Sequence, residues 1–119
     1  MSPMNFSTTT LGGALRLRLT VSRFVDSGEF DLFIDQLLAE IDRQDAPRVI
    51  LDLAEVDYFG SAMLGLLVNV RQRVRALGGK LVIAAAPKRL LDSIVTTSMD
   101  RLFTLAANVD EARRLLESR

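Results

Sequence analysis

The chain has 119 residues, of which 49% are hydrophobic and 25% are charged, and these values predict one folded domain over residues 1–119. Fifteen basic residues balance fifteen acidic ones, so no net charge favours nucleic acid or an anionic membrane. The lack of cysteine excludes disulfides and thiolate metal sites, and the lack of histidine excludes a serine–histidine hydrolase. Neither a signal peptide nor a membrane-length apolar run is recognisable, so we expect a cytoplasmic protein without membrane insertion.

The first segment predicts a β-hairpin. Residues 6–10 are rich in threonine, which favours a strand, and Gly12-Gly13 supplies a tight turn. Over residues 15–19 leucines alternate with arginines. This period of two is typical of a half-buried strand whose arginines face water.

A helical pattern begins near Glu29. Asp26 or Ser27 is placed to cap this helix, and Pro47 requires that it end before that point. Asp26 is also expected to lie on the surface. The apolar positions recur at helical spacing and form one stripe. They are Phe30, Phe33, Ile34, Leu37, Leu38 and Ile41.

The central stretch joins a strand to a second helix. Residues 49–53 are almost continuously apolar, as in a strand within a sheet. After Tyr58 and Gly60 a long helical pattern starts at Ser61. The Ser61 hydroxyl is placed to cap the first-turn N–H groups, and a phosphate on it would face the same groups and the positive end of the helix dipole. An ordinary cap and a regulatory switch both fit this pattern.

Three carboxylates follow one another along the same stretch. Asp52 lies inside the apolar strand, and we favour a structural role in which it accepts hydrogen bonds from its surroundings. Asp52, Glu55 and Asp57 together could hold Mg²⁺, but solvated turn residues are the simpler interpretation. No Gly-Lys-Ser/Thr follows Gly60, so there is no phosphate-binding loop of that type. We therefore expect no cofactor, no metal site and no enzymatic activity.

The second helix is predicted to run from Ser61 to the Gly78-Gly79 pair, where a glycine suits the left-handed position that ends a helix. The spacing of six residues, mostly apolar, predicts that they share one side of this helix. They are Leu64, Leu67, Val68, Arg71, Val74 and Leu77.

The rest of the chain continues the alternation of strands and helices. A strand is expected over residues 80–85, a helix over residues 88–96 and a short strand over residues 102–105. Asn108 is placed to cap a last helix, with Glu111 in the capping-box position. The order β-β-α-β-α-β-α-β-α predicts an α/β fold, a mixed β-sheet with an N-terminal hairpin and about four helices.

The central motif resembles that of a known family. Its members carry a hydrophobic-Leu-Asp-Leu strand and then Asp-Ser-(Ser or Thr)-Gly-Leu-Gly at the start of a helix. Here residues 51–53 read Leu-Asp-Leu and residues 60–65 read Gly-Ser-Ala-Met-Leu-Gly, with the serine, the leucine and the last glycine in register. Gly78-Gly79, Pro87 and Val-Asp-Glu-Ala at residues 109–112 add further matches. Over nearly its whole length, the chain resembles STAS domain proteins of the bacterial anti-sigma factor antagonist family.

The chain departs from the family pattern around the serine. The family's aspartate is replaced by Gly60, its second Ser/Thr by Ala62 and its next glycine by Met63. The first strand-to-helix loop, which often reads Gly-Glu-Leu-Asp in the family, is Val-Ser-Arg-Phe-Val-Asp at residues 21–26. These replacements make the expected site flatter and more apolar.

The resemblance implies that Ser61 is the residue that an anti-sigma factor serine kinase phosphorylates. The unphosphorylated antagonist would bind the kinase and free a sigma factor, phosphate would weaken that binding, and a serine phosphatase would reverse the change. The implied function is transcription regulation by partner switching. The partner-binding surface expected around this serine comprises Asp26, Tyr58, Gly60, Ser61, Ala62, Met63, Leu64 and Leu66.

A second interpretation keeps the STAS-type fold and changes the function. STAS domains also serve as scaffolds of signalling assemblies and as accessory subunits of lipid-transport ATPases, without phosphorylation. Met63 and Leu66 would then belong to a constitutive docking patch. For Leu66 we consider burial in the core the better interpretation, but not for Met63.

Overall fold

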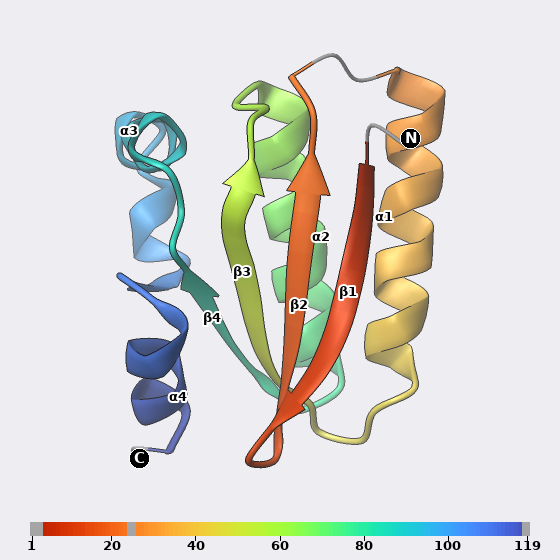
Figure 1. The fold of residues 1–119 in the computed structure, drawn as a ribbon, viewed down its shortest axis with the longest axis vertical. Helices are drawn as coiled ribbons and strands as arrows, with labels where there is room; N and C mark the ends of the chain where they lie inside the picture. The colour runs from red at the N-terminus through yellow and green to blue at the C-terminus, as the bar shows by residue number, and fades with distance from the viewer. Residues whose placement is uncertain (1–3, 24–25, 118–119) are drawn as a thin grey trace.

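The computed structural model describes residues 4–23 and 26–117, and it opens with the predicted hairpin (Figure 1). Strands β1 (Met4–Leu11) and β2 (Ala14–Val21) pair antiparallel. The turn between them consists of Gly12 and Gly13, with φ of 54° and 87°. Glycine adopts these positive values without strain, so the glycine pair fixes the position of the turn.

Three further strands extend the sheet in chain order. They are β3 (Arg48–Val56), β4 (Lys80–Ala84) and β5 (Thr104–Ala106), and the sheet order is β1-β2-β3-β4-β5. Strands β2 to β5 are all parallel. Their carboxyl ends therefore lie at one end of the sheet, and the segments that leave them emerge together there.

The helices follow these strands as predicted, so the order β-β-α-β-α-β-α-β-α and the α/β class with a mixed sheet are confirmed. One short 3₁₀ helix, η1 (Met99–Arg101), precedes β5, which begins two residues later than predicted. The α-helices are α1 (Ser27–Asp42), α2 (Ser61–Ala76), α3 (Lys88–Thr96) and α4 (Val109–Glu117).

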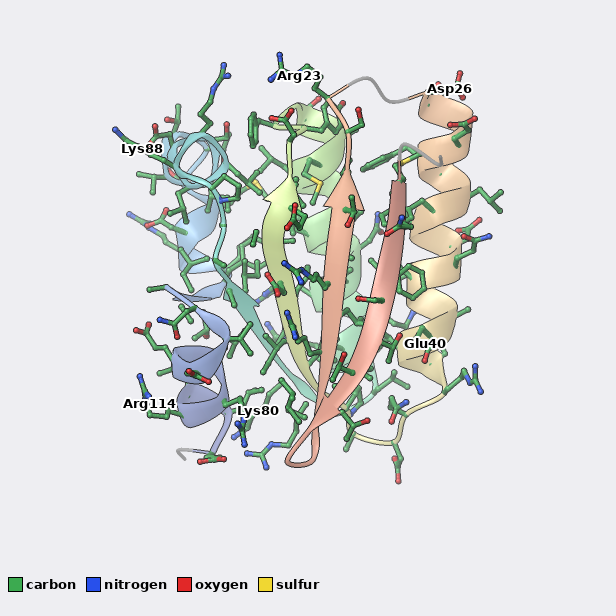
Figure 2. All side chains as sticks on the ribbon, in the orientation of Figure 1. Arg23, Asp26, Glu40, Lys80, Lys88 and Arg114 are labelled. Carbon is green, nitrogen blue, oxygen red and sulfur yellow. The ribbon has the colours of Figure 1, made fainter. Side chains whose placement is uncertain are left out.

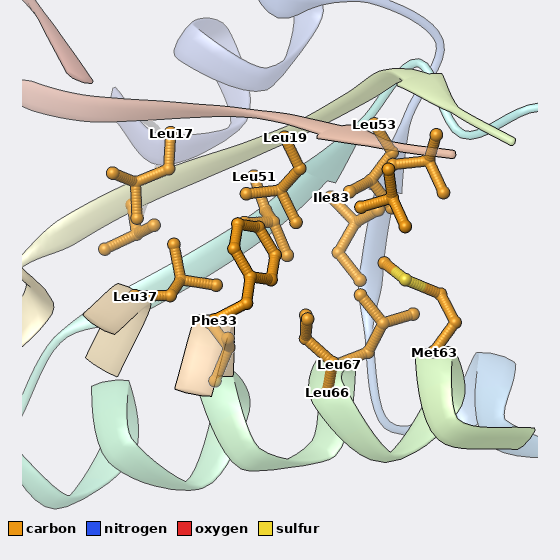
Figure 3. Packing of buried hydrophobic residues seen from close by; sticks show 14 of the residues in the cluster. Leu17, Leu19, Phe33, Leu37, Leu51, Leu53, Met63, Leu66, Leu67 and Ile83 are labelled. Atoms are coloured by element: carbon orange, nitrogen blue, oxygen red, sulfur yellow. The ribbon is translucent and has the colours of Figure 1, made fainter. Parts of the chain in front are cut away.

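The main core lies between the sheet and helices α1 and α2 (Figure 3). Alternate side chains of β2 and β3, such as Leu17, Leu19 and Leu51, point to this face of the sheet and are fully buried. Phe33 and Leu37 of α1 pack against them. The predicted stripe of α1 is confirmed, since its buried residues all belong to it.

The predicted side of α2 is confirmed only in part: Leu67 and Val74 are buried, but the centre of the buried side lies about one position earlier than predicted. The buried residues are Met63, Leu66, Leu67, Val70 and Val74, whereas Leu64 and Val68 are only half-buried. Six of the eight residues from 63 to 70 are large and apolar, so two neighbouring stripes fit a period of 3.6 equally well. Only packing against the sheet selects one of them.

Helix α4 covers part of the opposite face. Ala112 and Leu116 pack there on Ile50 and Val82 in a smaller core. The predicted capping box is present in a shifted form: the N–H of Glu111 donates to Oδ1 of Asn108 (2.8 Å), and Oε1 of Glu111 accepts from the N–H of residue 107 (3.3 Å) instead of residue 108.

Candidate functional site

The segment from β3 to α2 lies at the carboxyl end of the sheet. The N–H of Asp57 donates to the carbonyl of Val21 (2.8 Å), which extends the β2–β3 pairing by one bond beyond the strands. The N-termini of α1 and α2 lie at this same end (Figure 1). Arg23, Asp26 and Lys88 are also found there (Figure 2). The parallel strands thus bring residues from several distant parts of the chain to one end of the molecule.

Ser61 is the first residue of α2 and is exposed, not the N-cap that we predicted. The N-cap is Gly60, whose extended backbone (φ −74°, ψ 173°) lets its carbonyl accept from the N–H groups of Met63 and Leu64. Within the described residues, no side chain caps the first turn of α2. The hydroxyl of Ser61 is therefore not engaged as a cap, and it stands beside a helix end with positive partial charge.

Helix α1 offers a direct contrast at the same end of the sheet. Oδ1 of Asp26 accepts from the N–H of Gly28 (2.9 Å) and of Glu29 (3.1 Å), which confirms the capping role predicted for it. Ser27 is the first residue of α1, as Ser61 is of α2, and both are exposed. The two serines therefore differ mainly in whether a carboxylate already occupies their helix end.

Tyr58 explains why residue 60 is a glycine. A Cβ atom at Gly60 would lie 2.8 Å from the hydroxyl oxygen of Tyr58 and 2.9 Å from its Cε1. The Tyr58 ring is held in place, because it packs edge-on against Phe30 of α1 with ring centroids 5.8 Å apart. Tyr58 thus fills the space that a side chain at residue 60, such as the family's aspartate, would need.

Met63 and Leu66 do not belong to the surface, which corrects the partner-binding set predicted from the sequence. Both are fully buried and face the sheet (Figure 3). In a helix that begins at Ser61, these two positions lie on the side opposite to Ser61. Ala62 is exposed and Leu64 is half-buried, so both remain at the candidate surface.

Phe59 and Arg89 were missed by the sequence analysis. The guanidinium carbon of Arg89, in the first turn of α3, lies 5.4 Å from the centroid of the Phe59 ring, a cation–π distance. The pair brings a positive charge to the end of the sheet that holds Ser61. The signal in the sequence was indirect: α3 leaves β4 at the same end at which α2 leaves β3.

The three carboxylates considered for a cation are bound by arginines of β2 and the residues that follow it. Oδ2 of Asp52, which is buried, accepts from Arg16 (2.9 Å), and its Oδ1 accepts from the N–H of Ala54 (3.1 Å). The other two pairs are Arg18–Glu55 and Arg23–Asp57, each at 3.1 Å. Arg16 therefore does not simply face water, and Asp52 has the structural role that we favoured.

A comparison of the sequence with models of known protein families identifies the family of this chain. The model of the STAS domain matches residues 5–112, and this range includes the whole site. The chain belongs to the STAS domain family. Its helices contribute nothing long and apolar enough to cross a membrane, as far as the described residues extend.

Several solved structures share the fold at low sequence identity. An anti-sigma-factor antagonist (STAS) domain protein from Planctomyces limnophilus superposes with a TM-score of 0.83 at 19% identity, covering 95% of this chain and 98% of that one. A putative anti-sigma factor antagonist from Thermotoga maritima gives 0.79 at 18% identity, covering 95% of both chains. The anti-sigma factor antagonist SpoIIAA in its unphosphorylated form gives 0.71 at 13% identity, covering 92% and 93%.

Proposed function

We propose that this protein is an anti-sigma factor antagonist that is switched by phosphorylation of Ser61. In this proposal the unphosphorylated protein binds an anti-sigma factor serine kinase through the end of the molecule that carries Ser61. The kinase transfers phosphate to the Ser61 hydroxyl, the complex weakens, and a serine phosphatase restores binding. The protein itself catalyses no reaction.

The observation that carries the proposal is the exposed Ser61 at the first turn of an uncapped helix, at the position of the serine in the motif that the chain resembles. A phosphoserine bears about −1.5 to −2 charges at neutral pH. Within this protein, the free N–H groups and the dipole of α2 favour that charge. A partner packed over the same helix end would have to desolvate it, so binding weakens without any refolding of the STAS domain.

The proposed partner surface is the set of predicted residues that the structure leaves accessible, together with Phe59 and Arg89. It is formed by the first turn of α2 and by Tyr58, with the cap of α1 on its flank. Ala62 beside Ser61 has almost no side chain, so a partner can approach the helix backbone closely there. The accessible residues are Asp26, Tyr58, Phe59, Gly60, Ser61, Ala62, Leu64 and Arg89.

An in vitro reaction with an anti-sigma factor kinase that phosphorylates another STAS domain antagonist tests the proposal. The kinase is incubated with ATP and the full chain, and the phosphorylated residue is located by mass spectrometry. We expect one phosphate on Ser61 and none on S61A. Ser27 is an internal control, because it is exposed and opens a helix whose end Asp26 already occupies. Phosphate on Ser27 but not on Ser61 would contradict the proposal.

One observation favours a second candidate function, that of a STAS scaffold or accessory subunit of a signalling assembly or a lipid-transport ATPase. Gly60 and Ala62 leave Ser61 without a neighbouring carboxylate or hydroxyl in the helix turn, so little beyond the backbone distinguishes it for a kinase. This candidate predicts a partner that binds S61A and S61E equally well. Recovery of a membrane ATPase with the chain, and of no kinase, would support it.

A further inference from the structure

A cavity of about 270 Å³ lies at the other end of α2, away from Ser61. Its walls are the C-terminal half of α2, the strands β4 and β5 and the end of α4. Figure 2 shows Lys80, one of its lining residues, toward the lower end of the molecule, whereas Arg23, Asp26 and Lys88 lie at the upper end. The proposed partner surface and this cavity are therefore separate.

The charged residues that line the cavity are all positive. Arg71, Arg75 and Lys80 contribute to its walls, and no described lining residue is acidic. Among residues 4–23 and 26–117, none of these three side chains takes part in an ion pair. By contrast, Arg73, on the same helix, pairs with Asp42. Although the chain has no net charge, the cavity therefore carries a local excess of positive charge, which favours an anion inside it.

The cavity also has an apolar side. Phe103 is buried behind it, and Leu102 and Leu115 are 43% and 38% exposed at its rim. These two leucines are among the few large apolar side chains that the described part of the chain leaves open to solvent. Exposed apolar side chains that gather at a concave site mark ligand-binding surfaces.

The cation Arg71 is already held in a fixed position. Its Nε donates to the carbonyl of Leu102 (2.7 Å), so its side chain is tied across the cavity from α2 to the segment before β5. A guanidinium has five N–H donors, and the remaining ones are available for a second acceptor. An anion that enters the cavity would meet a cation that needs little further ordering.

We propose that this cavity binds a small amphiphilic organic anion, with its carboxylate against Arg71, Arg75 and Lys80 and its apolar part against Leu102, Phe103 and Leu115. The volume is below the roughly 300–1,000 Å³ of pockets that enclose drug-sized ligands, so the ligand is small. A nucleic acid would need a wider basic surface than three side chains provide. This proposal does not rest on phosphorylation of Ser61.

Titration of the full chain with hexanoate, followed by amide NMR spectra, tests the proposal. We expect saturable shifts at Gly79, Lys80 and Phe103 with a Kd of about 1 mM or tighter. The uncharged analogue 1-hexanol is the matched ligand, and we expect it to bind at least about tenfold more weakly. No saturation by about 10 mM hexanoate, or equal affinity for hexanol, would overturn the proposal.

Two variants test whether hexanoate binds at the cations of this cavity. R75Q/K80Q removes two charges from exposed side chains, so its spectrum should stay dispersed while hexanoate affinity falls at least about tenfold. R114Q is the control, because Arg114 is an exposed arginine of α4 that does not line this cavity. Unchanged affinity in R75Q/K80Q, or an equal loss in R114Q, would show that the cations of the cavity do not bind the anion.

Discussion

At the scale of single residues, the pair Tyr58 and Gly60 sets the shape of the site. The Tyr58 ring occupies the space next to the Cα of Gly60 and is fixed by Phe30. The backbone of Gly60 is in an ordinary extended conformation (φ −74°), so glycine is needed there for lack of space and not for its φ angle. A site that is flat at residue 60 is therefore a consequence of the aromatic residue at position 58.

This coupling predicts the result of a double-mutant cycle. G60A should lower the free energy of unfolding by about 1–3 kcal/mol, the usual cost of overpacking. In the Y58A background, the same substitution should cost clearly less, because only the weaker N-capping of alanine relative to glycine remains. Urea unfolding of the four proteins measures both values. An equal cost of G60A in both backgrounds would mean that Tyr58 is not the obstacle.

Asp52 is the other residue whose environment defines its role. It is 3% exposed and accepts from Arg16 and from the N–H of Ala54. D52N should lower the free energy of unfolding by about 1.5–3 kcal/mol, the contribution of a hydrogen bond to a charged group. E55Q is the matched control on β3, because the exposed pair that it weakens contributes at most about 1 kcal/mol. If both variants lost equal stability in urea unfolding, the structural role of Asp52 would not hold.

At the scale of elements, the period of the hydrophobic residues was sufficient to predict the order and type of nearly all helices and strands. It was insufficient where apolar residues crowd together. In α2, the run from Met63 to Val70 fits two stripes, so the burial of Met63 could not be deduced before the sheet was in place. The start of α2 at Ser61 was predicted correctly, but its N-cap was assigned one residue too late, because serine is the commoner N-cap and the space taken by Tyr58 is not visible in the sequence.

The uncapped start of α2 predicts that negative charge at residue 61 stabilises the fold. S61E should raise the free energy of unfolding by about 0.3–1 kcal/mol relative to S61Q, which has the same size and no charge. Thermal and urea unfolding at low ionic strength measure the difference, and added salt should reduce it. A less stable S61E would indicate that the end of α2 does not favour a phosphate.

At the scale of the whole molecule, α2 connects two different surfaces. Its first turn carries Ser61 at the carboxyl end of the sheet, and its last turns line the cationic cavity. Between them its buried side packs on the central strands, so the helix is held as a rigid part of the core. We therefore expect phosphorylation to change the charge of one end of the molecule without moving the other.

The central claim is that phosphate on Ser61 weakens binding of the partner kinase. Isothermal titration calorimetry measures this directly. An anti-sigma factor kinase that binds another STAS domain antagonist is titrated, without ATP, into the unmodified chain and into the Ser61-phosphorylated chain. We predict binding of the unmodified chain and at least about tenfold weaker binding of the phosphorylated chain. Equal affinity of the two forms, or tighter binding of the phosphorylated form, would contradict the account.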